Sequence, residues 1–194
     1  MFEDIRAIYR NDPALMGNVF KKIEVILYPG LYAIVIHRYI SHPLDYIKIP
    51  FIPRLISQIM RFLTGIEIHP GAKIGRGFFI DHGMGVVIDG TAVIGKNCVL
   101  FHNVTLGGTG KHIGKRHPTL GDNVLVGTGS ILLGPITVGS NVKIGADSTI
   151  INKNIPSNCT VVGTPAKIVR LNGKKLNLEL REENFNKLKL REEK

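Results

Sequence analysis

The sequence predicts an α+β fold in which an N-terminal α-helical segment, residues 1–65, precedes a parallel β-helix over residues 66–170. From Glu67 to Ile150, large aliphatic residues recur every six positions, a period that fits neither an α-helix nor a single strand. Residues 1–65 instead space their apolar side chains as helices do. A highly charged tail, residues 171–194, follows the repeat.

The six-residue repeat is typical of a prism with three flat sides, each built from one short strand and a corner. The aliphatic residue points to the axis, and coils stack about 4.8 Å apart over one inner column. Thirteen positions in phase make accidental spacing untenable. The in-phase residues are Ile68, Ile74, Ile80, Ile88, Ile94, Leu100, Leu106, Leu120, Val126, Leu132, Val138, Ile144 and Ile150, with small or β-branched residues two positions earlier at Ala72, Ala92, Cys98, Val124, Ser130, Val142 and Ser148. Glycine often follows the aliphatic residue, which suits tight corners or close backbone approach.

The N-terminal segment predicts four short helices that cap the open first coil of the prism. The last of them is amphipathic, and its apolar face is expected to pack on the prism's end or on a partner helix, with membrane-surface attachment as the alternative. Residues 23–36 are apolar but contain Glu24 and a Pro-Gly break, so no membrane span is expected. The predicted helices cover residues 3–10, 18–28, 31–42 and 50–63, with Pro43 expected to end the third.

The composition of the chain argues against several classes of protein. The net charge of +10 is spread along the chain, Trp is absent and aromatic residues are 7%, so a nucleic-acid-binding patch is not expected. A basic surface suits an anionic small ligand such as a phosphorylated cofactor. Cys98 and Cys159 form no CxxC motif, which argues against a disulfide framework or zinc knuckle. The acidic opening Met1–Asp4 is unlike a signal peptide, so a cytoplasmic protein is expected.

An insertion interrupts the repeat between Leu106 and Leu120, where about eight extra residues leave the prism as a loop within 107–119. This loop is rich in glycine and carries lysines, an arginine and two histidines but no acid. We interpret it as a flap whose cations meet a carboxylate or phosphate, with Arg116 able to hold a carboxylate through paired hydrogen bonds. A flexible solvated loop is the alternative.

The repeat also slips by two residues between Ile80 and Ile88, which makes residues 80–86 a second irregularity. His82 lies in this segment, follows an inward residue and is expected at an outward coil edge. Gly83 and Gly85 are expected to let a ligand approach the backbone there. Glu67 precedes His82 by fifteen residues, about one coil. A carboxylate beside a histidine fixes its tautomer and makes the other nitrogen a competent general base. A surface histidine without a catalytic role is the alternative.

Five motifs occur in the sequence at residues 64–75, 80–83, 104–110, 115–118 and 161–167. In this order they resemble the serine O-acetyltransferase family. That family makes O-acetylserine for cysteine synthesis on a left-handed parallel β-helix, so the resemblance implies this fold and activity. It also implies that His82 is the general base, that Glu67 orients it and that no metal is required.

The resemblance implies the substrate contacts as well. Asp81, Arg116 and His117 match serine-binding positions, and Asp12 matches an aspartate that reaches the serine amino group. Acetyl-CoA, the cosubstrate, is implied to lie along the groove between neighbouring subunits' prisms. Its expected contacts are Gly108, Gly127, Lys143, Ala146 and Lys167.

The chain also departs from the family's pattern. Glu67 stands where many members have Asp, and residues 87–91 replace the usual Val-Val-Gly-Glu-Thr. The N-terminal part is shorter than in long members, whose extra helices join two trimers, so a homotrimer is expected and a hexamer is the competitor. The charged tail differs from the Ile-ending peptide that enters cysteine synthase, which argues against that partnership.

Three alternative functions are kept. One is an acetyltransferase for another small hydroxyl acceptor, such as a sugar or an antibiotic. Another is a γ-type carbonic anhydrase that binds zinc through His82, His112 and His117, the last two at H-x4-H spacing. The third is a non-catalytic trimeric scaffold. A metal assay separates the anhydrase, and thiol release from acetyl-CoA separates the acetyltransferases.

Overall fold

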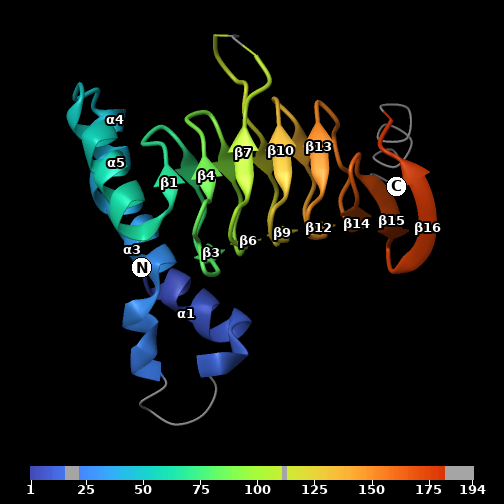
Figure 1. The fold of residues 1–194 in the computed structure, drawn as a ribbon, viewed down its shortest axis with the longest axis horizontal. Helices are drawn as coiled ribbons and strands as arrows, with labels where there is room; N and C mark the ends of the chain where they lie inside the picture. Colours follow the sequence, from blue (N-terminus) through green and yellow to red (C-terminus); the bar gives the residue numbers. More distant parts are fainter. Residues whose placement is uncertain (16–21, 111–112, 182–194) are drawn as a thin grey trace.

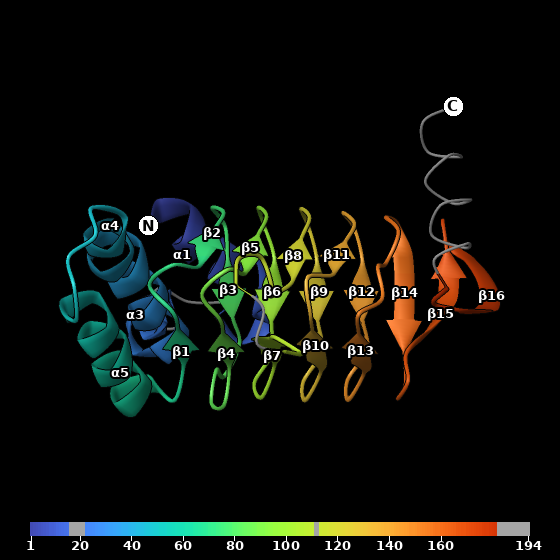
Figure 2. The same cartoon turned by 90° about the horizontal axis from the view of Figure 1, so that it is seen from above.

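The computed structural model describes residues 1–15, 22–110 and 113–181, which form N-terminal helices followed by a parallel β-helix (Figures 1 and 2). The helices are α1 (Phe2–Asn11), η1 (Pro13–Leu15), η2 (Glu24–Leu27), α3 (Pro29–Ile36), the π turn η3 (His37–Ser41), α4 (His42–Tyr46) and α5 (Ile52–Thr64). This architecture confirms the fold that the repeat and the helical segment predict.

Each coil of the prism contributes one strand to each of three sheets. The first sheet contains β1 (Glu67–Ile68), β4 (Val87–Ile88), β7 (Thr105–Gly107), β10 (Ile131–Leu133) and β13 (Thr149–Ile151). The second contains β2 (Lys73–Ile74), β5 (Val93–Ile94), β8 (Thr119–Leu120) and β11 (Thr137–Val138). The third contains β3 (Phe79–Ile80), β6 (Val99–Leu100), β9 (Leu125–Val126), β12 (Lys143–Ile144), β14 (Cys159–Val162), β15 (Lys167–Leu171) and β16 (Lys174–Glu179).

The inner column is the one that the sequence predicts. Every in-phase aliphatic residue is buried except Ile74, which is partly exposed on the outermost strand of its sheet. The small residues two positions earlier are fully buried. Ser130 and Ser148 satisfy their buried hydroxyls by donating to the Gly145 carbonyl at 2.9 and 2.7 Å, which removes the penalty of an unpaired polar group in the core.

The corners use glycine and asparagine for different reasons. A Cβ on Gly75 would lie 2.5 Å from the Gly95 carbonyl oxygen, so close backbone approach requires glycine there. The corner between the second and third sheets instead requires a left-handed backbone, which Asn tolerates better than most residues. It is occupied by Asn97, Asn123, Asn141 and Asn158, whose φ values lie between 56° and 59°.

The second and third predicted helices, residues 18–28 and 31–42, compare with the structure in different ways. The predicted helix 18–28 lies partly outside the described residues, and its described part includes the 3₁₀ helix η2. The prediction that Pro43 ends the third helix is wrong, because helical backbone continues through α3, η3 and α4 to Tyr46. The π turn widens the helix where the Pro43 ring would otherwise meet the carbonyl of Tyr39.

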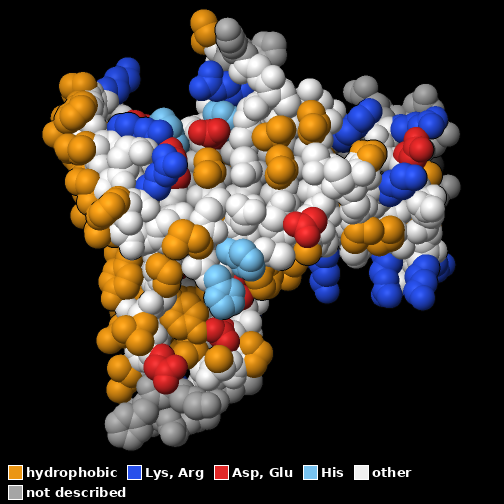
Figure 3. All heavy atoms as spheres, viewed as in Figure 1, with side chains coloured by type: hydrophobic (Ala, Val, Ile, Leu, Met, Phe, Trp, Pro, Cys, Tyr) orange, Lys and Arg blue, Asp and Glu red, His pale blue; other side chains and the backbone are white. Residues whose placement is uncertain are grey.

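Helix α5 packs on the first coil through its polar side. Ser57 is buried and donates to the Ile68 carbonyl at 2.7 Å. The predicted apolar face is turned outward, so it does not cover the prism's end. Hydrophobic side chains accordingly line the helical end of the molecule (Figure 3). The exposed residues of this face are Ile52, Leu55, Ile59, Phe62 and Leu63.

The far end of the prism is closed by strands that run against one another. β15 pairs antiparallel with β14, and β16 pairs antiparallel with β15. The charged segment 171–194 therefore contributes a strand, and its residues 182–194 lie outside the described part. Among the helices of the described residues, none combines the length and apolarity needed to cross a bilayer.

Candidate active site

The predicted site residues gather at two corners that border the first sheet. His82 follows β3 at the corner leading to β4, whereas Arg116 and His117 lie in the loop between β7 and β8. This loop stands out from the prism beside β7 (Figure 1). Histidine side chains are visible at both edges of this face (Figure 3). The chain thus presents two half-sites instead of one assembled site.

The first corner holds a hollow of about 280 Å³ between the N-terminal helices and the prism. It brings together three residues that the family resemblance predicts, Asp12, Asp81 and His82. Among the described residues that line it, none is a lysine or arginine, so the hollow is electrostatically suited to an ammonium group. Its lining consists of Asp12, Glu24, Leu27, Tyr28, Pro29, Asp81 and His82.

His82 has a left-handed backbone, with φ of 59°, as the asparagines at the prism's corners do. The side chain is 76% exposed, and its Nε2 lies 3.8 Å from Asp81 Oδ1, which is longer than a hydrogen bond. The His102 ring meets it edge-on at 5.9 Å, and His102 Nε2 lies 2.7 Å from the Thr128 hydroxyl.

The glycines beside His82 have a packing role that the sequence did not indicate. Both Gly83 and Gly85 have positive φ, 78° and 77°. A Cβ on Gly83 would lie 2.4 Å from Ile66 Cδ1, and one on Gly85 would lie 2.9 Å from Asn103 Oδ1. Their absent side chains are therefore required by the corner itself, and room for a ligand does not explain them.

The expected contact between Glu67 and His82 is not formed within a single chain. Glu67 lies on β1, facing α5, and its Oε1 is 2.6 Å from Arg54 Nη2 while its Oε2 is 3.1 Å from Arg61 Nη1. Gln58 also donates to Oε1, at 3.2 Å. The fifteen-residue spacing places Glu67 one coil away but does not reveal that α5 brings two arginines to it. Asp81 is the carboxylate beside the imidazole.

Asp12 is fixed at both carboxylate oxygens. It follows the last residue of α1, and its Oδ1 accepts a hydrogen bond from the Ala14 amide at 2.8 Å. Its Oδ2 accepts a hydrogen bond from the Tyr28 hydroxyl. Burial, followed by the hydrogen bond to Asp12, raises the pKa of Tyr28 well above its usual value. Tyr28 therefore remains a protonated donor at neutral pH.

The second corner is organised by Thr91. Its amide donates to His117 Nδ1 at 2.9 Å, and its hydroxyl accepts the amides of Arg116 and His117 at 3.0 and 3.2 Å. Lys115 Nζ donates to the Thr91 carbonyl at 2.6 Å. These bonds fix the base of the loop and so the point from which Arg116 extends.

His117 is buried, unlike His82. Since its Nδ1 accepts a hydrogen bond from the Thr91 amide, neutral His117 carries its own proton on Nε2, which lies 3.5 Å from Asp89 Oδ2. Burial lowers the pKa of His117 despite the nearby Asp89 carboxylate. The imidazole is therefore a neutral hydrogen-bond donor near neutral pH.

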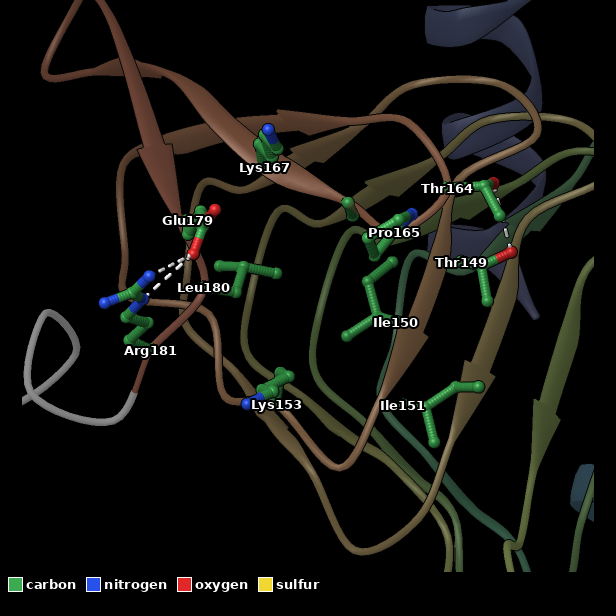
Figure 4. Close-up of a pocket in the computed structure, with 11 residues that line it drawn as sticks. Thr149, Ile150, Ile151, Lys153, Thr164, Pro165, Lys167, Glu179, Leu180 and Arg181 are labelled. Carbon is green, nitrogen blue, oxygen red and sulfur yellow. Dashed lines mark hydrogen bonds and ion pairs between the residues drawn. The ribbon is translucent and has the colours of Figure 1, made fainter.

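The residues expected to contact acetyl-CoA lie at separate places. Gly127 and Ala146 stack in neighbouring coils, since a Cβ on Gly127 would lie 2.6 Å from the Ala146 nitrogen, while Gly108 lies against the His117 ring. Lys143 borders a polar hollow on the third sheet. Lys167 lines a larger hollow of about 520 Å³ at the end of the first sheet, where Ile150 and Leu180 face it together with Lys153 (Figure 4).

Three residues of these corners were missed by the sequence reasoning. His102 occupies the position of His82 one coil later, which aligning successive coils would have found. Thr91 lies in the motif that departs from the family's pattern, a signal read only as a change in charge. Tyr28 carried no signal, because its partner Asp12 is sixteen residues away across a turn.

The zinc alternative gains no support from geometry. Within residues 1–15, 22–110 and 113–181, no three metal-ligating side chains gather into a site. His112, one of its proposed ligands, lies outside the described residues. His82 and His117 occupy different corners.

Comparison with known proteins identifies the family. Residues 117–152 match the bacterial transferase hexapeptide model. The serine acetyltransferase of Synechococcus elongatus is 52% identical over 171 residues, covering 88% of this chain and 68% of that protein. A structure of Entamoeba histolytica serine acetyltransferase isoform 3 with cysteine gives a TM-score of 0.74 at 43% identity, covering 82% of this chain and 55% of that one.

A structure of Neisseria gonorrhoeae serine acetyltransferase in complex with serine is also similar, with a TM-score of 0.79 and 39% identity. The match covers 86% of this chain and 66% of the Neisseria chain. This chain thus spans less than two thirds of both solved chains. Because the Synechococcus elongatus protein is 52% identical over 88% of this chain and 68% of its own length, this chain belongs to the serine acetyltransferase family, as its motifs predict.

Proposed function

We propose that this chain transfers the acetyl group of acetyl-CoA to the hydroxyl of L-serine, giving O-acetylserine for cysteine biosynthesis. The observation that carries the proposal is the opposite charge of the two corners. One presents Asp12 and Asp81 beside His82, and the other presents Arg116 beside His117. An amino acid carries one ammonium and one carboxylate group, which match these two corners.

In this proposal the serine ammonium binds at Asp12 and Asp81 of one subunit, and the carboxylate binds at Arg116 and His117 of a neighbouring subunit. A planar guanidinium suits a carboxylate because it can donate two parallel hydrogen bonds. Neutral His117 adds a donor at Nε2. The hydroxyl of serine then lies toward His82, whose imidazole lines the acidic hollow.

The chemistry follows as direct transfer. His82 removes the hydroxyl proton while the serine oxygen attacks the thioester carbonyl carbon. A backbone amide or the loop stabilises the oxyanion of the tetrahedral intermediate. The carbon–sulfur bond breaks, and His82 returns the proton to the CoA thiolate. No acylated enzyme residue and no metal are invoked, and Asp81 is the neighbouring carboxylate that stabilises the imidazolium.

We place acetyl-CoA in a groove between neighbouring prisms, with Gly108, Gly127 and Ala146 offering backbone contacts. Lys143 and Lys167 offer cations to its phosphates. The 76% exposure of His82 supports this arrangement, because general-base catalysis needs a site screened from water that one chain does not supply. A homotrimer in the cytoplasm completes the proposal.

Identification of the product tests the function. The purified protein is incubated with acetyl-CoA and L-serine, and mass spectrometry follows the amino acid. The proposal expects serine to gain one acetyl group on oxygen, in step with the release of free CoA. Acetylation of a sugar or antibiotic, with serine unchanged, would support the second acceptor class instead.

A further inference from the structure

Tyr28 is one of four lining residues of the acidic hollow that are not among the expected site residues. Tyr28 lies between η2 and α3, and its hydroxyl donates to Asp12. Among the described residues, the other hydrogen bond to the Asp12 carboxylate comes from the Ala14 amide and is local to its own turn. Tyr28 is therefore the side chain that connects Asp12 to the rest of the described fold.

Tyr28 is itself anchored to the prism. Its ring lies 6.3 Å from the Phe79 ring at an angle of 45°, and both side chains pack in an apolar cluster with Ile8, Leu15 and Val25. Phe79 belongs to β3, the strand that leads directly to Asp81 and His82. The chain of contacts from His82 to Asp12 thus passes along β3, across the two rings and through one hydroxyl.

A carboxylate at a helix end is otherwise free to rotate. Fixing both oxygens leaves Asp12 one orientation and reduces the entropy lost when a ligand binds. The pKa of Tyr28, raised by burial and by Asp12, keeps its hydroxyl a donor throughout the working pH range. Asp81 also lines the same hollow, so an ammonium placed between the two carboxylates would meet oxygens already in position.

We propose that Tyr28 is a positioning residue for amino-acid specificity, which holds the Asp12 carboxylate toward the ammonium group of the acceptor. This inference rests on the proposed function and goes beyond it by naming the group that sets the discrimination against acceptors without an amine. Tyr28 does not touch the reacting atoms and acts through Asp12.

The test compares Tyr28→Phe with a matched control, Tyr9→Phe. Each variant keeps its ring and loses one hydroxyl, but the Tyr9 hydroxyl donates to the Lys22 carbonyl and lines no part of the hollow. We expect Tyr28→Phe to raise the KM for L-serine about tenfold, the loss typical of a hydrogen bond to a charged group. The KM for acetyl-CoA and the kcat stay within about twofold, as do all constants of Tyr9→Phe.

A second readout uses 3-hydroxypropanoate, which has the hydroxyl and carboxylate of serine but no amine. Tyr28→Phe should reduce the preference for serine over this acceptor about tenfold. In an Asp12→Asn background the same change should have no further effect, since residues that act through one another are not additive. Thermal unfolding of each variant shows whether it is folded.

The outcomes separate the inference from the function. A wild-type protein without serine-dependent CoA release overturns both. An active wild type whose Tyr28→Phe variant keeps the serine KM, or loses affinity equally for serine and acetyl-CoA, overturns the inference alone. Equal effects of Tyr28→Phe with and without Asp12 also overturn it, because Tyr28 would then act by another route.

Discussion

Arg54 Nη2 and Glu67 Oε1 lie 2.6 Å apart, and this ion pair ties helix α5 to the first strand of the prism. Arg61 pairs with the other oxygen of the same carboxylate. The motif carboxylate of this chain therefore has a structural partner on each oxygen. Its contribution within one chain is to hold the polar side of α5 on the first coil.

Glu67→Gln should lower the Tm of the protein, and it should reduce kcat less than a His82 variant does. It weakens two partly exposed ion pairs, worth about 1 kcal/mol together, which corresponds to a fall in Tm of about 2–4 °C for a chain of this size. Calorimetry and steady-state kinetics on one preparation check this. An unchanged Tm with kcat reduced as far as in a His82 variant would show that Glu67 acts on the imidazole after all.

His82→Ala should lower kcat by about 10²–10⁴, the usual contribution of a general base. The side chain is exposed, so its removal leaves the fold intact. His102→Ala removes the neighbouring ring and is expected to reduce kcat less than tenfold. Near-normal turnover in His82→Ala, or equal losses in the two variants, would contradict the assignment of the base.

Arg116→Ala should raise the KM for serine far more than the KM for acetyl-CoA, because its guanidinium is assigned to the amino acid's carboxylate. Arg76→Ala, an exposed arginine beside Glu3, serves as the control and should change neither constant. If Arg116→Ala instead raised both KM values equally, the guanidinium would belong to the cofactor phosphates.

Acid should destabilise the fold through His37. Burial lowers the pKa of this side chain to about 3, against 6.5 in an unfolded chain. Between these values the unfolded state binds the extra proton, so stability falls as pH drops below 6.5, by up to about 1.4 kcal/mol per pH unit. Urea unfolding from pH 7 to pH 4 measures this slope. His37→Gln should flatten it, and an identical slope in both proteins would exclude His37 as its source.

The assembly is expected to be a trimer of about 64 kDa, three times the 21.4 kDa chain. The exposed apolar face of α5 is the surface through which a second trimer could attach. Light scattering at micromolar concentration measures the mass. A value near twice that of the trimer would show that the short N-terminal segment still joins two trimers. Leu55→Glu on α5 should then restore the smaller mass.

The sequence predicted the prism well because its period follows from backbone geometry alone. A residue such as Leu106 or Val126 can satisfy the six-residue repeat only by pointing inward. The third helix was predicted less well, since the π turn that accommodates Pro43 has no local signal. The outward face of α5 was also unforeseen, because amphipathic spacing gives two faces without saying which one meets the prism.

The candidate site was predicted in its residues but not in its contacts. The family resemblance named Asp12, Asp81 and His82, and the fold places all three in the lining of one hollow. The resemblance did not reveal that Arg54 and Arg61 hold Glu67, since both belong to a helix whose docking depends on tertiary structure. Tyr28 was invisible for the same reason. Spacing along one chain places residues on a coil, whereas partners from other elements require the fold.

The most direct test of the account is the release of CoA thiol from acetyl-CoA across a panel of hydroxyl acceptors. The panel contains L-serine, D-serine, 3-hydroxypropanoate, a hexose and an aminoglycoside. We expect the highest kcat/KM for L-serine, at least about tenfold above that for 3-hydroxypropanoate, which has no amine. A higher kcat/KM for the hexose or the aminoglycoside, or no thiol release with any acceptor, would contradict it.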